Sequence, residues 1–250
     1  MFPKNFVRNE QAVEPVDRGN GQDLDVHSIF HTIQGEGPFS GHAATFVRLA
    51  GCNLQCPMCD TEYTQGRQRI SIHELSVCCA AANKLHRGRG VPLIVITGGE
   101  PLRQPIGPFI RVMAAAGFAI QVETNGLLAP PRAPWSRLLD GGHPKAGSAY
   151  LVVSPKAAKV HADARAEAAC WKYVLRFGEI DVTDGLPVRA LAHPVKGRVA
   201  RPAKWDKVYI QPADEKDIVA NQRNMTACVA VAQEFGYTLQ LQIHKYLGVE

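Results

Sequence analysis

The alternation of strand-like and helix-like segments constrains the fold of this chain more than any other feature. Short runs rich in Val, Ile and aromatic residues predict strands at 26–33, 43–49, 92–96, 118–122, 150–153, 171–175, 207–210 and 238–243. Helical periodicity predicts helices that start at residue 71 and that span 105–116, 161–169 and 214–235, with a shorter helix at 135–139. Strands that alternate with helices pair in parallel through right-handed crossovers. Because these segments do not complete eight β/α units, the sequence predicts an α/β fold, a partial and incomplete TIM-like barrel.

Local signals mark two of the helix boundaries. Ser71 and Glu74 have the spacing of a capping box, and Gly236 can end the helix that precedes it. Cys78 and Cys79 fall in the apolar pattern of the helix that Ser71 begins. Both cysteines are therefore assigned to packing rather than to a metal site.

Polar clusters follow almost every predicted strand. They are Gln34-Gly35-Glu36, the three cysteines within 52–59, Thr97 to Glu100, Glu123 to Gly126, Ser154 to Lys156, Gln211-Pro212 and His244. The carboxyl ends of parallel strands lie at one edge of a sheet, where α/β folds and barrels place their active sites. We therefore expect these clusters to converge on one pocket.

The three cysteines Cys52, Cys56 and Cys59 have the spacing C-x3-C-x2-C on a short loop. A structural zinc ion usually takes four protein ligands, and a four-iron cluster is normally held by four thiolates. Three cysteines on such a cluster would leave one iron open to another ligand. A zinc loop and three unrelated core cysteines remain as alternatives.

This spacing resembles the signature of the radical S-adenosylmethionine (SAM) enzymes. In that superfamily SAM binds the open iron of a [4Fe-4S] cluster, and the reduced cluster cleaves SAM to a 5′-deoxyadenosyl radical. The resemblance implies that Cys52, Cys56 and Cys59 hold the cluster. The residues it implies for SAM are Met58, Cys59, Asp60, Gly99, Glu100, Ser154, Pro155, Lys156, Gln211, Pro212, Ala213 and Asp214.

From about residue 26 to the end, the chain also resembles the 7-carboxy-7-deazaguanine synthase family. The motifs that carry this resemblance are Gln34 to Gly37, Phe46 to Cys52, Cys59-Asp60-Thr61, Thr97 to Pro101, Glu123 to Gly126, Ser154-Pro155-Lys156 and His244 to Leu247. The resemblance implies a radical SAM barrel, usually paired as a homodimer. It also implies conversion of 6-carboxy-5,6,7,8-tetrahydropterin to 7-carboxy-7-deazaguanine with loss of ammonia, on the route to queuosine.

The same resemblance assigns roles around the substrate. Thr61 would bind a Mg2+ ion that also binds the substrate carboxylate, with Asp60 in support, and Arg48 would pair with that carboxylate. Glu123 and His244 are implied as the catalytic residues. The residues implied for substrate binding are Ile33, Gln34, Gly35, Glu36, Arg48, Thr97, Glu123, His244 and the terminal Glu250.

Composition and charge limit the partners and the compartment. The formal charge of +5 comes without a dense Lys/Arg run, so nucleic-acid binding is unsupported. Seven cysteines without a secretory signal or a membrane-spanning run predict a cytoplasmic protein. Residues 1–24 are polar and aperiodic and predict a poorly packed extension before a single domain at 25–250, whereas 178–204 support no assignment. The expected protein partners are a second copy of the chain and an electron donor such as flavodoxin or ferredoxin.

Two other functions remain open on the sequence. An activating enzyme for a glycyl-radical protein would share the cysteine loop but would need neither the Gln34-Gly35-Glu36 cluster nor Thr61. An iron–sulfur or zinc-binding interaction module would leave the polar clusters after the strands unexplained.

Overall fold

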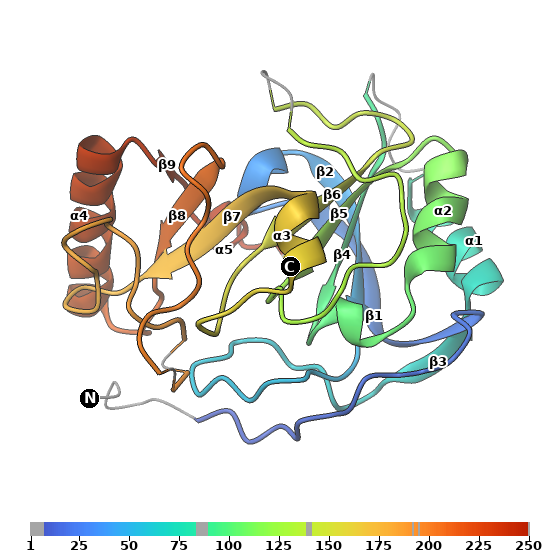
Figure 1. Cartoon of the computed structure of the whole chain (residues 1–250). Helices are drawn as coiled ribbons and strands as arrows, with labels where there is room; N and C mark the ends of the chain where they lie inside the picture. The colour runs from blue at the N-terminus through green and yellow to red at the C-terminus, as the bar shows by residue number, and fades with distance from the viewer. Residues whose placement is uncertain (1–7, 84–89, 139–141, 192, 195, 250) are drawn as a thin grey trace.

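The computed structural model describes residues 8–83, 90–138, 142–191, 193–194 and 196–249. These residues form one nine-stranded sheet in the order β3-β1-β2-β4-β5-β6-β7-β8-β9 (Figure 1). The strands are β1 (Asp23–Ile33), β2 (Ala43–Leu49), β3 (Gln68–Ser71), β4 (Leu93–Gly98), β5 (Ala119–Thr124), β6 (Ala149–Val153), β7 (Ala168–Leu175), β8 (Val208–Pro212) and β9 (Thr238–Leu239). The helices are α1 (Ile72–Asn83), α2 (Gly107–Ala115), α3 (Ala162–Glu167), α4 (Ile218–Phe235) and α5 (Ile243–Leu247). In Figure 1, α4 lies beside β8 and β9 at one end of the sheet, and α1 and α2 lie at the other end.

The sheet is curved but open, which confirms the predicted partial barrel. All neighbouring pairs from β2 to β9 are parallel. The expectation of a wholly parallel sheet is wrong at one edge, where β1 pairs antiparallel with both β2 and β3. Residues 34–42 join β1 to β2 without the long crossover that a parallel pair requires.

The two faces of the sheet bury different sets of side chains. One face packs against the helices through a large apolar core that includes Val47, Ile96 and Trp171. The other face encloses a smaller apolar cluster that includes Phe39, Leu93 and Tyr150. Because side chains alternate along a strand, residues further toward the carboxyl ends share the enclosed face. There the barrel interior turns polar, with Arg48 on β2, Thr97 on β4, Glu123 on β5, Lys172 on β7 and Gln211 on β8.

Both predicted helix boundary signals are confirmed, but one of the two cysteine assignments is wrong. The capping box is confirmed, since the Ser71 amide donates to Glu74 Oε2 and the Glu74 amide donates to Ser71 Oγ, each over 3.2 Å. Gly236 ends α4 with φ 73°. The packing assignment is correct for the buried Cys79 and wrong for Cys78, which is exposed.

Several predicted boundaries differ from the structure. The strand predicted at 171–175 begins earlier, since β7 starts at Ala168, inside the helix predicted at 161–169. The helix predicted from residue 214 begins at Ile218, because Asp217 provides the cap by accepting from the Ala220 amide over 2.7 Å. The strand predicted at 238–243 is only β9, and α5 begins where that prediction ended. The short helix predicted at 135–139 is absent from its described part, 135–138.

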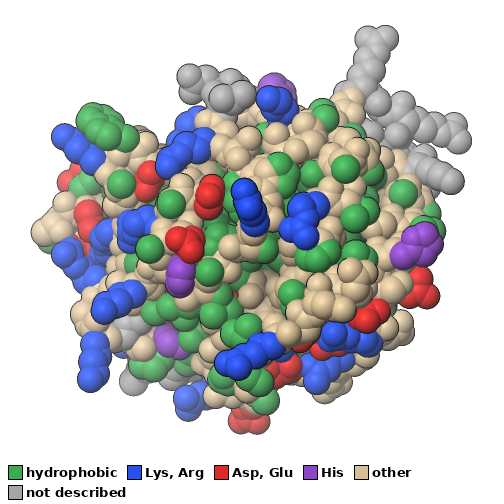
Figure 2. Space-filling view, turned by 45° about the vertical axis from the view of Figure 1, so that its right-hand side comes forward, with side chains coloured by type: hydrophobic (Ala, Val, Ile, Leu, Met, Phe, Trp, Pro, Cys, Tyr) green, Lys and Arg blue, Asp and Glu red, His purple; other side chains and the backbone are tan. Residues whose placement is uncertain are grey.

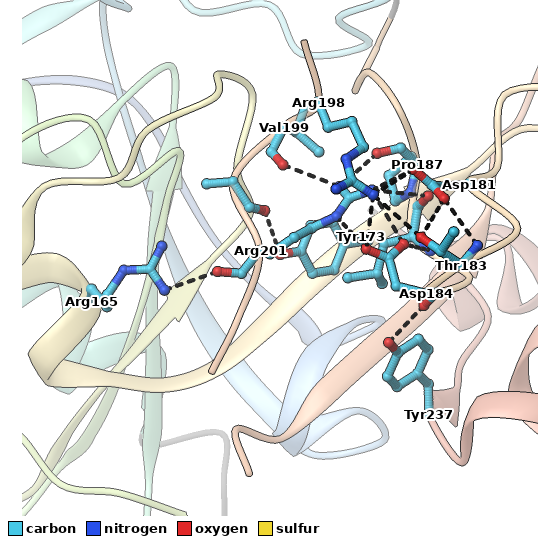
Figure 3. A network of polar contacts seen from close by, with 12 residues as sticks. Arg165, Tyr173, Asp181, Thr183, Asp184, Pro187, Arg198, Val199, Arg201 and Tyr237 are labelled. Atoms are coloured by element: carbon cyan, nitrogen blue, oxygen red, sulfur yellow. Dashed lines mark hydrogen bonds and ion pairs between the residues drawn. The ribbon is translucent and has the colours of Figure 1, made fainter. Parts of the chain in front are cut away.

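An ionic network organises the segment 178–204, for which the sequence supported no assignment (Figure 3). Arg201 Nε donates to Asp184 Oδ2 over 2.7 Å, and Arg198 Nη1 donates to Asp181 Oδ2 over 2.6 Å. Tyr173 on β7 donates its hydroxyl to the Ala200 carbonyl over 2.8 Å. The network therefore ties this segment to the helix-facing side of the sheet.

The molecular surface carries both charge signs. Figure 2 shows Lys and Arg side chains spread over the visible face among acidic and hydrophobic ones. No helix within the described residues has the length and apolar character needed to cross a membrane.

Candidate active site

The loop between β2 and β3 carries the three cysteines. Cys52 and Cys56 are buried and Cys59 is half-buried, and all three are free thiols. Burial raises the pKa of Cys52 to about 12 and that of Cys56 to about 11. Metal binding requires thiolates and so displaces these protons. The other four cysteines lie on α1, β7 and α4, so this loop offers three thiols to a cluster.

The Gly-Gly-Glu motif after β4 lies against the start of the cysteine loop. The Glu100 amide donates to the Gly51 carbonyl over 3.0 Å, and a Cβ added at Gly99 would overlap that carbonyl. Only glycine permits this close approach. The motif therefore fixes the backbone from which Cys52 projects.

The Glu100 carboxylate, only 1% exposed, already binds protein donors. It accepts from the Leu102 amide at 3.0 Å, the Thr124 hydroxyl at 2.7 Å and the Asn125 amide at 2.8 Å. Asn125 in turn donates to Asn53 Oδ1 in the cysteine loop over 2.8 Å. Glu100 thus joins the ends of β4 and β5 to the cysteine loop, and roughly one of its four acceptor positions remains for a ligand.

The motif after β6 also faces the cysteines. Lys156 Nζ donates to both the carbonyl and the hydroxyl of Ser154 over 2.7 Å. Burial lowers the pKa of Lys156, while the charges of Cys56 and Cys59 oppose that shift. A half-buried ammonium beside these sulfurs suits a negatively charged group at the same place.

The N-terminal segment differs from the predicted poorly packed extension. Asn9 donates through Nδ2 to the Cys56 carbonyl over 3.2 Å, and Gln11 donates through Nε2 to the Thr61 carbonyl over 2.8 Å. The Glu14 amide donates to the Cys52 carbonyl over 2.7 Å. In Figure 1 this segment runs along the lower edge of the molecule beside the cysteine loop. The prediction missed these contacts because they link polar groups distant in sequence.

A buried cluster of opposite charges lies in the polar part of the barrel interior. Lys172 Nζ donates to Glu36 Oε2 over 2.5 Å and to Glu123 Oε2 over 2.8 Å. Burial acts to raise the pKa of Glu36, but the Lys172 ammonium and hydrogen bonds from Gln242 and Gln211 lower it to about 2. Burial disfavours the ammonium of Lys172, yet the two carboxylates raise its pKa.

Side-chain amides complete this cluster. Gln34 and Gln121 both donate to Glu123 Oε1, over 3.2 and 2.8 Å, and Gln242 donates to Glu36 Oε1 over 2.5 Å. The structure therefore joins the predicted residues Gln34 and Glu36, from the segment after β1, with Glu123 on β5. It adds Lys172, which sequence reasoning missed. The available signal was a single lysine inside the otherwise apolar run of β7.

His244 lies at the same mouth of the barrel, on α5. A Cβ added at Gly35 would overlap the His244 ring, and the Ile243 amide donates to the Gly35 carbonyl over 3.3 Å. Burial lowers the pKa of His244, with the charge of Glu36 opposing the shift. The Gly35 backbone thus sets the position of the histidine.

Arg48 extends the polar face from β2, with its Cα paired to that of Thr97. Its guanidinium carbon lies 5.1 Å from the centroid of the Phe30 ring. Its Nε is buried and finds no hydrogen-bond acceptor among the residues that the structure describes. Such an orphaned donor suits a carboxylate-bearing ligand.

The residues after β8 are engaged by protein partners. Gln211 Oε1 accepts from Gln240 Nε2 over 2.9 Å, and the Ala213 carbonyl accepts from Asn224 Nδ2 over 2.9 Å. Asp214 Oδ2 pairs with Lys216 and Lys245 over 2.7 and 2.9 Å. Despite partial burial, these bonds lower the pKa of Asp214. Gln211 also forms a hydrogen bond with Glu36. It therefore lies beside the charged cluster, whereas the sequence predicted a contact with SAM.

The remaining predicted residues occupy the rim or lie beyond the described chain. Thr61 Oγ1 donates to Asp60 Oδ1 over 3.5 Å, and the Met58 amide donates to the Leu191 carbonyl over 3.1 Å. No group of three or more His, Cys, Asp and Glu side chains is arranged for a metal ion in the described part of the chain. Ile33 ends β1 and Pro155 lies between Ser154 and Lys156, and Glu250 falls outside the described residues.

Comparison with known proteins gives a consistent result. No family model matches the chain. The 7-carboxy-7-deazaguanine synthase of Rhodospirillum rubrum is 38% identical over 255 residues, covering 100% of both chains. The enzyme of the same name from Rickettsia prowazekii is 34% identical over 239 residues, covering 93% of this chain and 91% of its own. The crystal structure of QueE from Escherichia coli shares the fold, with a TM-score of 0.61 and 23% identity over 88% of this chain and 93% of that chain. On the full-length match, the chain belongs to the 7-carboxy-7-deazaguanine synthase family.

Proposed function

We propose that this chain converts 6-carboxy-5,6,7,8-tetrahydropterin to 7-carboxy-7-deazaguanine with release of ammonia. Membership of the family supports the reaction. The observation that carries the proposal is the meeting of two groups of residues at one mouth of the barrel. One is the cysteine loop with the Ser154–Lys156 motif, and the other is the Glu36–Lys172–Glu123 cluster.

The cysteine side of the mouth would hold the cluster and SAM. Cys52, Cys56 and Cys59 supply three thiolates, and the half-buried Lys156 suits the carboxylate of SAM. When bound, the reduced cluster and SAM supply a carbon-centred radical that removes a hydrogen atom from the substrate. The further residues proposed for SAM are Met58, Asp60, Gly99, Glu100, Ser154, Pro155, Gln211, Pro212, Ala213 and Asp214.

The carboxylate side would hold the pterin. Ionised Glu36 and Glu123 accept hydrogen bonds, as the N–H groups of a pterin edge require. The orphaned Arg48 Nε suits the substrate carboxylate. Gln34, the Gly35 backbone, Thr97 and Ile33 line the same mouth, and His244 lies against Gly35. The site would hold both molecules in the orientation that the reaction needs, which raises the effective concentration of the reacting groups. It would also exclude water.

We also propose that a Mg2+ ion binds at Thr61. The hydroxyl of Thr61, beside the Asp60 carboxylate, is an oxygen ligand of the kind that Mg2+ prefers. Mg2+ would orient the substrate carboxylate, and substitution of Thr61 by Val should weaken the dependence of turnover on added Mg2+. Free cysteines throughout the chain fit a reducing cytoplasm, and we include a homodimer and a flavodoxin- or ferredoxin-type donor in the proposal.

The test is turnover by the reconstituted protein under anaerobic conditions with dithionite, SAM, Mg2+ and 6-carboxytetrahydropterin. Mass spectrometry should detect 7-carboxy-7-deazaguanine, and Cys56→Ala should abolish it. Release of 5′-deoxyadenosine without the deazaguanine would keep the radical SAM class and reject this substrate. Absence of both products, from protein with a full cluster, would reject the proposal.

A further inference from the structure

The strand β7 places one lysine between two carboxylates in the barrel interior. Lys172 is 5% exposed, and its Nζ touches an oxygen of Glu36 and an oxygen of Glu123. The neighbours of Lys172 on the strand, Trp171 and Tyr173, point to the opposite, apolar face. Burying a lysine costs free energy. If Lys172 only filled space, an apolar residue could do so without that cost.

The two carboxylates converge on one ammonium group. Glu36 follows β1 and Glu123 ends β5, so they reach Lys172 from separate strands. When two partly buried carboxylates share one site without a cation, each charge disfavours the other, so the pKa of one of them is raised. With Lys172 the three groups carry one net negative charge, and the amides of Gln34, Gln121 and Gln242 bind the outer oxygens.

We propose that Lys172 is a positioning residue that holds the carboxylates of Glu36 and Glu123 aligned to accept hydrogen bonds from the substrate. The inference rests on the proposed function, in which these two carboxylates bind the pterin. A protonated carboxyl presents an O–H donor where the pterin also presents N–H donors, so loss of either charge opposes substrate binding.

Other charged groups near this cluster do not replace Lys172. Lys156 interacts with Lys172 from beyond β6 but is bonded to Ser154. Cys170 precedes Lys172 on the same face of β7, and burial raises the pKa of its thiol, which leaves it uncharged. His244 interacts with Glu36 from α5, and burial lowers the pKa of this histidine. Near neutral pH, Lys172 is therefore the cation that directly bonds both carboxylates.

The experiment compares wild type with Lys172→Met, Lys172→Gln and Lys172→Arg. Substrate affinity is measured by calorimetry on cluster-loaded, unreduced protein with SAM present, and kcat/KM is measured on reduced protein, both from pH 6.5 to 8.5. In the Met and Gln variants one carboxyl should become protonated, so the ratio of wild-type to variant affinity should fall about tenfold or more as the pH rises. The Arg variant keeps the charge and should show a flat ratio. Lys204→Met, which removes an exposed lysine, is the charge control.

The double variant Lys172→Met with Glu36→Gln removes the conflict between carboxylates and should lose the pH dependence. A pH-independent ratio in the Met and Gln variants would overturn the inference. If Glu36→Gln and Glu123→Gln each leave substrate affinity unchanged, the proposed substrate site itself is wrong. If both weaken binding while the Lys172 variants match wild type at every pH, only the role of Lys172 is wrong.

Discussion

At the scale of single residues, the site depends on close contacts between backbone and side chains. Gly35 allows the His244 ring to lie directly on the chain, and Gly99 allows the Gly-Gly-Glu motif to approach the Gly51 carbonyl. Neither position depends on a positive φ, so the requirement for glycine comes from space rather than from backbone strain. Gly35 lies on the proposed substrate side of the mouth, and Gly99 lies on the cysteine side.

Substitution of Gly35 by Ala should displace His244. The added methyl group overlaps the imidazole, so the ring must move while the remote apolar core is untouched. We expect KM for the pterin to rise about tenfold, equivalent to roughly 1.4 kcal/mol of lost binding, with little change in KM for SAM. Steady-state kinetics measure both values.

Gly117→Ala is the control for this substitution, because a Cβ there meets no atom within 4 Å and Gly117 follows α2 rather than joining the substrate residues. Its φ of 88° predicts some loss of stability, but KM should stay at the wild-type value. An unchanged pterin KM in Gly35→Ala would show that the position of His244 does not matter for binding.

At the scale of elements, the cysteine loop is held from the N-terminal segment as well as from β4 and β5. Alanine at both Asn9 and Gln11 removes hydrogen bonds to the Cys56 and Thr61 carbonyls. At about 0.5–1.5 kcal/mol for each net hydrogen bond, the loop should open roughly tenfold more often. Loss of iron–sulfur absorbance in air should accelerate to a similar extent.

Asn20→Ala is the control, because it removes a hydrogen bond to the Gln22 amide within the same segment rather than one to the cysteine loop. This variant should lose its cluster at the wild-type rate. Equal rates of cluster loss in the Asn9/Gln11 double variant and wild type would contradict the role of the N-terminal segment.

The ionic network of the segment 178–204 should be a second source of stability. Arg201→Met leaves the Asp184 carboxylate and the Pro187 carbonyl without this donor. We expect a loss of about 2 kcal/mol in the free energy of unfolding, or a decrease in Tm of about 4–8 °C. Arg198, whose side chain is 50% exposed, is the control, and Arg198→Met should lower Tm clearly less than Arg201→Met does. Equal Tm values for the two variants would contradict this ranking.

Elements with local signals could be predicted from the sequence, whereas those set by distant partners could not. The bounds of β2, the capping box at Ser71 and the end of α4 at Gly236 follow from neighbouring residues. The pairing of β3 with β1 and the hydrogen bonds of Asn9 join segments far apart in sequence. Lys172 was missed for the same reason, since its carboxylate partners lie 136 and 49 residues away.

At the scale of the whole molecule, the open barrel brings a thiol-bearing loop and a carboxylate cluster to one mouth. The apolar cluster around Phe39 and Tyr150 fills the interior below them. The Glu100–Asn125–Asn53 hydrogen bonds connect the ends of β4 and β5 to the cysteine loop. This arrangement gives the proposed cofactor and the proposed substrate separate sets of residues.

The most direct measurement of this division is the effect of Ser154→Ala and Glu123→Gln on the two KM values, determined from product formation under anaerobic conditions. Ser154→Ala should raise KM for SAM several-fold and leave KM for the pterin unchanged, because Ser154 lies with Lys156 beside the cysteines. Glu123→Gln should do the reverse, because Glu123 lies in the Lys172 cluster. If both variants raise both KM values equally, or if the two effects are exchanged, the division of the barrel mouth into a cofactor side and a substrate side is wrong.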